Sequence, residues 1–93
     1  MRIDANGISV HYSIEGPDDR PVVVLSHSLA ANLSMWDWQM SVLEDYRVVR
    51  YDTRGHGGTD APVGEYTLEM LAEDLFGFLD ALNLDAVHYI GLS

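Results

Sequence analysis

Cysteine and lysine are both absent from the 93-residue sequence. Without cysteine the chain can form no disulfide, no thiolate nucleophile and no cysteine-ligated zinc site. Without lysine it offers neither Schiff-base chemistry nor the lysine of a phosphate-binding loop. The absence of cysteine is compatible with a reducing cytoplasm, which is where we expect the protein to act.

Positive charge is scarce as well. Five basic residues stand against fifteen acidic ones, which gives a net charge of -10 at pH 7. Such a charge repels the phosphates of nucleic acids and of anionic lipids, so we expect neither nucleic acid nor membrane as a partner. The sequence also has no apolar run long enough to span a bilayer, and residues 1–5 lack the apolar segment of a signal peptide.

The content that is present is ordinary for a globular chain, with 47% apolar residues. Residues 1–5 and 8–15 flank Asn6-Gly7, a dipeptide that favours the type I′ turn of a β-hairpin. An antiparallel hairpin is therefore predicted to open the fold. Residues 21–25 form a short apolar run with a β-branched core, as in a strand buried on both faces of a sheet. Two further strands are predicted at 46–51 and 86–90.

Two amphipathic segments between these strands are predicted to be helices. Ser34 and Asp37 resemble a capping box for a first helix, residues 34–44. Thr67 would cap a second helix, in which apolar residues recur at helical spacing over 68–82. The order β-β-β-α-β-α-β predicts an α/β fold, in which the hairpin leads into a mostly parallel sheet with flanking helices.

Polar residues follow three of the predicted strands. Because the carboxyl ends of parallel strands meet at one edge of a sheet, where α/β proteins bind their ligands, we expect these residues to lie together. The three segments are His27-Ser28-Leu29, Asp52-Thr53-Arg54 and Gly91-Leu92-Ser93.

Ser93 is the candidate nucleophile. Gly91-Leu92-Ser93 forms the first half of G-x-S-x-G, the tight strand-to-helix turn that exposes a reactive serine hydroxyl. The string by itself fits equally a turn in which serine caps a helix. Its position directly after a strand of an α/β chain favours the nucleophile.

The loop after the first buried strand is a candidate oxyanion hole. A tetrahedral oxyanion needs two backbone N–H groups aimed at it, and the Leu29 amide is our candidate for one of them. Ser28, beside it, and Trp36, in the following helix, are candidate substrate contacts. Trp36 fits equally a core position, since aromatic residues at helical spacing are more often buried in the core.

Arg54 is a candidate for binding a substrate carboxylate, because it is the one cation near the expected mouth of the site. The alternative, which we favour, is that Arg54 pairs with Asp52 or with Asp60 and fixes the loop. His27 and His56 are expected to shape their loops rather than to transfer protons. Neither histidine has the helical spacing of a zinc protease, so we expect no metal.

Together these motifs resemble the amino-terminal part of α/β-hydrolases. The most specific are D-x-R-G-x-G at 52–57 and G-x-S at 91–93. H-S-L-A-A at 27–31, L-S-M-W-D at 33–37 and R-Y-D-T-R-G-H-G at 50–57 are most similar to the 3-oxoadipate enol-lactonases. Related esterases, C–C bond hydrolases and cofactor-free haloperoxidases share much of this pattern.

The resemblance implies a cofactor-free serine hydrolase of a small lactone or ester, above all 3-oxoadipate enol-lactone in aromatic catabolism. The family orders its triad Ser, Asp, His, so the Asp and His would come from beyond Ser93. Residues 1–93 would then be the first part of a single hydrolase domain, inactive without the remainder of the polypeptide. The alternatives are another activity on this fold, such as that of a carboxylesterase, C–C hydrolase, haloperoxidase or acyltransferase, and a non-catalytic binder of small molecules.

Overall fold

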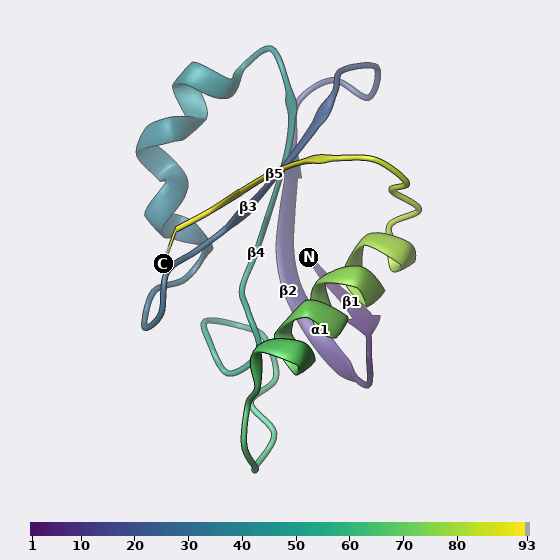
Figure 1. The fold of residues 1–93 in the computed structure, drawn as a ribbon. Coiled ribbons are helices and arrows are strands. Elements are labelled where there is room, and N and C mark those ends of the chain that lie inside the picture. Colours follow the sequence, from purple (N-terminus) through teal and green to yellow (C-terminus); the bar gives the residue numbers. More distant parts are fainter. Residues whose placement is uncertain (93) are drawn as a thin grey trace.

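Five strands form one mixed sheet in the computed structural model, which describes residues 1–92 (Figure 1). The strand order is β1-β2-β4-β3-β5. β3 pairs in parallel with β4 and β5, whereas β2 pairs antiparallel with β1 and β4. The predicted α/β fold, a hairpin that leads into parallel strands, is confirmed. The strands are β1 (Arg2–Ala5), β2 (Ile8–Glu15), β3 (Val22–Ser26), β4 (Arg47–Tyr51) and β5 (His88–Gly91).

The hairpin turns where the sequence predicts it. Asn6 has a φ of 48° and Gly7 a φ of 80°, the two positive values that a type I′ turn requires. Ala5 is consequently paired with Ile8, and both side chains are buried. The turn therefore fixes which face of β2 is directed into the protein.

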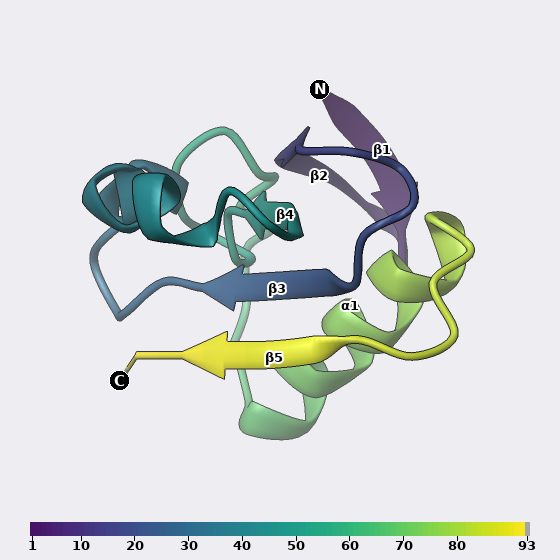
Figure 2. The same ribbon diagram turned by 90° about the horizontal axis from the view of Figure 1, so that it is seen from above.

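Two helices cover opposite faces of the sheet, as Figure 2 shows from above. Alternate residues of β3 supply the two cores. Val24 lies with Phe78 of α1 (Leu68–Ala81), whereas Val23 and Leu25 lie with Trp36 of η1 (Leu33–Leu43). This division follows from the two-residue period of a strand, and it explains why the run is apolar throughout.

The first helix differs from the prediction in type and in its cap. η1 is a 3-10 helix, and its N-cap is Asn32 rather than Ser34. The Asn32 side chain accepts hydrogen bonds from the backbone N–H of Ser34, at 2.9 Å, and from its hydroxyl, at 2.6 Å. Asp37 forms no capping box, because its carboxylate instead accepts a hydrogen bond from Arg50 at 2.6 Å.

The second helix begins as predicted. The Thr67 hydroxyl accepts a hydrogen bond from the Met70 N–H at 3.1 Å, which makes Thr67 the N-cap of α1. The apolar face of α1 is buried only in part. Phe78 is fully buried near the end of the helix, whereas Leu68 at its start is 82% exposed. The first half of α1 therefore leaves apolar side chains open beside the sheet.

β5 lies at the edge of the sheet, and all four of its residues are exposed. Tyr89 and Ile90 are the large apolar residues on this strand. β5 pairs with β3 on one side only within residues 1–92. Its other side therefore presents backbone hydrogen-bonding groups to the surroundings.

Candidate functional site

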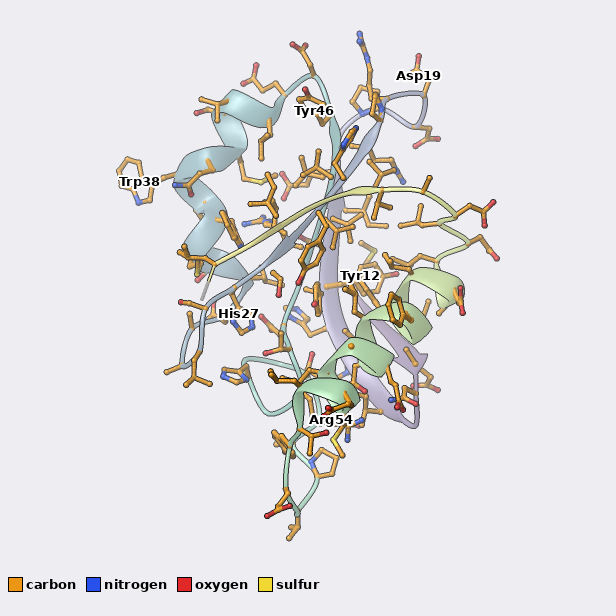
Figure 3. The ribbon with its side chains drawn as sticks, in the orientation of Figure 1. Tyr12, Asp19, His27, Trp38, Tyr46 and Arg54 are labelled. Atoms are coloured by element: carbon orange, nitrogen blue, oxygen red, sulfur yellow. The ribbon has the colours of Figure 1, made fainter. Side chains whose placement is uncertain are left out.

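The loops after β3 and β4 meet at one end of the sheet, as the sequence predicts. The Thr53 N–H donates to Nε2 of His27 at 3.0 Å, and the Ala30 N–H donates to Nε2 of His56 at 3.1 Å. The segment after β5 joins them through a hydrogen bond from the Leu92 N–H to the Ser26 carbonyl, at 3.2 Å. Figure 3 shows His27 and Arg54 at this end of the molecule.

Asp52 ties these loops together from a position that is 2% exposed. One carboxylate oxygen accepts the Leu33 N–H at 2.8 Å. The other accepts the Gly58 N–H at 2.8 Å and lies 2.8 Å from Nδ1 of His11. Burial acts to raise the pKa of Asp52, but the hydrogen bonds from Gly58, Leu33 and His11 outweigh it and hold this pKa below its ordinary value. Asp52 is thus a buried anion that organises the backbone around it.

Arg54 pairs with neither of its predicted partners. Its Nε and Nη2 donate to the two carboxylate oxygens of Asp74 on α1, at 2.8 and 2.7 Å. Both side chains are buried, and the hydrogen bonds from Arg54 to Asp74 raise the pKa of the guanidinium. Asp60, the other predicted partner, pairs with Arg2 instead, at 3.1 Å.

Asp74 is the residue that sequence reasoning missed. It also accepts a hydrogen bond from the side chain of Asn6 at 2.8 Å, so one carboxylate joins the β1–β2 turn, the loop after β4 and α1. A signal for it exists in the sequence. Asp74 lies three residues after Leu71 and four before Phe78, on the apolar stripe of the helix, and a carboxylate in that position indicates a buried cationic partner.

Of the four backbone N–H groups at residues 28–31, in the loop after β3, three have hydrogen-bond acceptors. The Ser28 N–H points to Sδ of Met35 at 3.4 Å, and the Ala31 N–H donates to the Ser28 carbonyl at 3.1 Å. The Ala30 N–H is taken by His56. Only the Leu29 N–H of these four finds no acceptor among residues 1–92. The Leu29 side chain is 85% exposed, so this amide belongs to an open loop.

A cavity of about 450 Å³ opens between α1, the sheet and the loops after β3 and β4. Its walls are apolar along α1 and the sheet, for example Leu71, Leu75 and Phe78, and polar at the loop end. Leu29 and Arg54 are among the lining residues. An apolar cavity with a few polar groups at one end is the usual form of a small-molecule site.

Two candidate substrate contacts lie outside this cavity. Trp36 is buried with Val23, Leu25 and Val48 in the core on the other face of the sheet, which is the alternative that the sequence left open. The Ser28 hydroxyl points to Sδ of Met35 at 3.6 Å rather than into the cavity. The candidate nucleophile, Ser93, lies outside the described residues.

Residues 1–92 contain neither a metal-ligand cluster nor a membrane-spanning helix. No three or more histidine, aspartate or glutamate side chains in this range are grouped so as to hold a metal ion. No helix in the same range is both long enough and apolar enough to cross a membrane.

The similar proteins include enol-lactonases, epoxide hydrolases and a non-heme chloroperoxidase of Streptomyces lividans. A profile of the alpha/beta hydrolase fold family matches residues 21–93. The chain is 42% identical to 3-oxoadipate enol-lactonase 1 of Acinetobacter baylyi, over 100% of this chain and 35% of the relative. It is 34% identical to epoxide hydrolase 4 of Homo sapiens, over 98% of this chain and 26% of the relative.

Solved structures agree with this result. The enol-lactonase from Burkholderia xenovorans LB400 superposes with a TM-score of 0.96 at 44% identity, covering 100% of this chain and 37% of that structure. The chain spans about a third of the length of the curated enol-lactonases that it matches, 34% and 35%.

Proposed function

The chain belongs to the α/β-hydrolase fold family, and from this we propose that the whole protein is a serine-dependent hydrolase of a small lactone or ester. In this proposal Ser93 is the nucleophile, and the Asp and His of its triad come from sequence beyond residue 93. 3-Oxoadipate enol-lactone is the substrate that we favour, because relatives named for that activity match the whole chain at 42% and 39% identity.

The observation that carries the proposal is the Leu29 amide. It lies three residues after the end of β3 and, within residues 1–92, has no acceptor, although the amides on both sides of it are used. An unused N–H on the loop beside a nucleophile is what an oxyanion hole requires. Leu29 lines the cavity, so a substrate held there would be within reach of this loop.

The proposed reaction passes through an acyl-enzyme. The Ser93 hydroxyl loses its proton to the triad histidine and attacks the lactone carbonyl, whose oxygen takes the negative charge and is bound by the Leu29 N–H. The ring C–O bond then breaks, and the departing enol receives the proton and becomes a ketone. Water attacks the resulting ester and frees both Ser93 and the carboxylic acid.

Arg54 keeps a part in this proposal. Its Nε and Nη2 are taken by Asp74, whereas no residue in 1–92 accepts a hydrogen bond from its Nη1. This one nitrogen is left to bind a substrate carboxylate from the cavity wall. Because the Asp74 carboxylate already offsets the charge of Arg54, we expect this hydrogen bond to orient the substrate carboxylate rather than to attract it strongly.

Epoxide hydrolysis is the second candidate, since human epoxide hydrolase 4 is 34% identical to this chain. Serine chemistry argues against it. A serine oxygen that opens an epoxide would form an ether, which water does not cleave, whereas a serine oxygen that attacks a carbonyl forms an ester, which water does cleave. With Ser93 as the nucleophile, carbonyl substrates are therefore favoured over epoxides.

Rates measured on the purified whole protein test the proposal. We expect turnover of 3-oxoadipate enol-lactone, slower turnover of a simple ester such as p-nitrophenyl acetate, and none of styrene oxide. Ser93→Ala should abolish turnover of both carbonyl substrates, and an acyl adduct should appear on the wild type by intact mass. Turnover of the epoxide, or full activity of Ser93→Ala, would contradict the proposal, and binding of the lactone without turnover would favour a non-catalytic binder.

A further inference from the structure

We propose that His27 and His56 act as a pair of positioning residues for the Leu29 amide, each as a neutral imidazole with its proton on Nδ1. The inference rests on the proposed function, because that function gives the Leu29 amide its task. It gives a role to two histidines for which the sequence predicts neither proton transfer nor metal binding.

The hydrogen-bond partners of His27 assign its tautomer. Its Nε2 lies 3.0 Å from the Thr53 backbone nitrogen, which can only donate, so Nε2 must accept and carry no proton. Its Nδ1 lies 2.8 Å from the Ser28 carbonyl oxygen, which can only accept, so Nδ1 must carry the proton. The ring is therefore neutral in this arrangement.

His56 has the same arrangement with other partners. Its Nε2 accepts the Ala30 N–H at 3.1 Å, and its Nδ1 donates to the Arg54 carbonyl at 3.0 Å. The Thr53 hydroxyl lies 3.1 Å from the same Nδ1 and 3.3 Å from Nε2 of His27, so it links the two rings. The ring centroids are 5.0 Å apart.

The two histidines brace the loops reciprocally. His27 belongs to the loop after β3 and accepts an amide of the loop after β4, whereas His56 belongs to the loop after β4 and accepts an amide of the loop after β3. The Ser28 carbonyl and the Ala30 N–H are thereby both held by imidazole nitrogens. These two groups stand immediately before and after Leu29, so its peptide unit is fixed from both sides.

The backbone conformation of Ala30 depends on the hydrogen bonds of this loop. Its φ is 63°, a left-handed conformation that is strained for a residue with a side chain. Residues keep such a conformation only where their surroundings hold them in it. Two hydrogen bonds hold Ala30 here: the Ala31 N–H donates to the Ser28 carbonyl and closes a turn around residues 29–30, and the Ala30 N–H donates to His56.

Kinetics of the whole protein separate a positioning role from a merely structural one. His56→Leu removes the acceptor, and we expect kcat to fall about 10- to 100-fold with KM changed less than about twofold, somewhat less than the loss of an oxyanion donor itself. His56→Gln keeps an acceptor near the position of Nε2, and it should restore kcat to within about threefold of the wild type. His88→Gln, on the exposed strand β5, is the matched control and should leave kcat unchanged.

A His56→Leu protein that keeps wild-type kcat overturns the inference, and so does one that raises KM alone. Long-range ¹H–¹⁵N spectra of the histidine rings at pH 7.5 give a second readout that needs no substrate. Two rings should show the Nδ1–H tautomer with Nε2 as acceptor, and their assignment to Nε2–H or to imidazolium would refute the pairing. If the tautomers are as stated and the wild type hydrolyses no carbonyl substrate, the proposed function fails, and with it the catalytic role, while the bracing itself stands.

Discussion

The Arg54 guanidinium and the Asp74 carboxylate form a buried bidentate ion pair, with Nε to Oδ2 at 2.8 Å and Nη2 to Oδ1 at 2.7 Å. Both side chains are less than a tenth exposed. The pair connects the loop after β4 to the first half of α1. The hydrophobic core around Phe78 holds only the second half of this helix. The position of α1 over the cavity thus depends on an ion pair as well as on the core.

Asp74→Ala should therefore be strongly destabilising, since it leaves Arg54 as a buried charge without its partner. We expect a loss of about 3–5 kcal/mol in the free energy of unfolding of the whole protein, measured in urea. Asp18→Ala is the control, because it breaks an ion pair between Arg47 and the 95% exposed Asp18 side chain and should cost no more than about 1 kcal/mol. Equal losses for the two variants would refute the role given to the Arg54–Asp74 pair.

Leu29→Pro tests the oxyanion hole directly, because proline has no N–H. We expect kcat to fall about 100- to 1,000-fold with little change in KM, which is the typical result of removing one oxyanion donor. Leu29→Ala keeps the amide and changes only an exposed side chain, so it should remain close to the wild type. The Leu29 amide has no catalytic role if the proline variant, still folded by circular dichroism, turns over at the wild-type rate.

The lowered pKa of Asp52 predicts that the folded protein loses stability in acid. Its pKa is lowered in the folded protein, so its contribution to stability is complete above the ordinary aspartate pKa of about 4 and is lost as the pH falls through the lower folded value. In Asp52→Asn this part of the acid dependence should be missing, and the variant should be less stable than the wild type at pH 7. Unfolding free energies measured between pH 3 and pH 7 would show it, and parallel curves for the two proteins would exclude it.

The positive φ of Ala30 predicts which side chains the loop tolerates at this position. Valine is β-branched and cannot easily adopt a φ of 63°, so Ala30→Val should move the loop and lower kcat about tenfold or more. Ala30→Gly accepts this conformation without strain and should keep most of the activity. Steady-state rates of the two variants on the same lactone provide the measurement, and equal rates would mean that the loop tolerates other conformations.

Local signals in the sequence were sufficient where the interactions are local. Asn6-Gly7 and Thr67 act on neighbours within three residues, and both predictions are confirmed. The cap predicted at Ser34 was wrong, because the Asn32 side chain accepts the Ser34 N–H and so places Ser34 inside the helix. The Leu33 N–H is also taken, by Asp52, which is distant in sequence. Propensity also does not separate a 3-10 from an α-helix over such a segment.

Long-range partners were the part that sequence patterns could not supply. Arg54 was expected to bind Asp52 or Asp60, both within its own loop, whereas Asp74 comes from the next helix. The polar loops after β3 and β4 were correctly brought together, because the topology of parallel strands requires it. Which amide in those loops lacks an acceptor within residues 1–92 depends on the positions of His27 and His56, and only the three-dimensional structure gives these.

The pairing of β3 with β5 sets an order on folding. Val23 of β3 pairs with His88 of β5, so the two strands come from distant parts of the chain and close a long loop. During synthesis on the ribosome, β3 can pair with β4 well before β5 has emerged. Until then its run of three valines and a leucine is an unpaired, uncharged edge of a kind prone to aggregation, and pairing with β5 covers this edge.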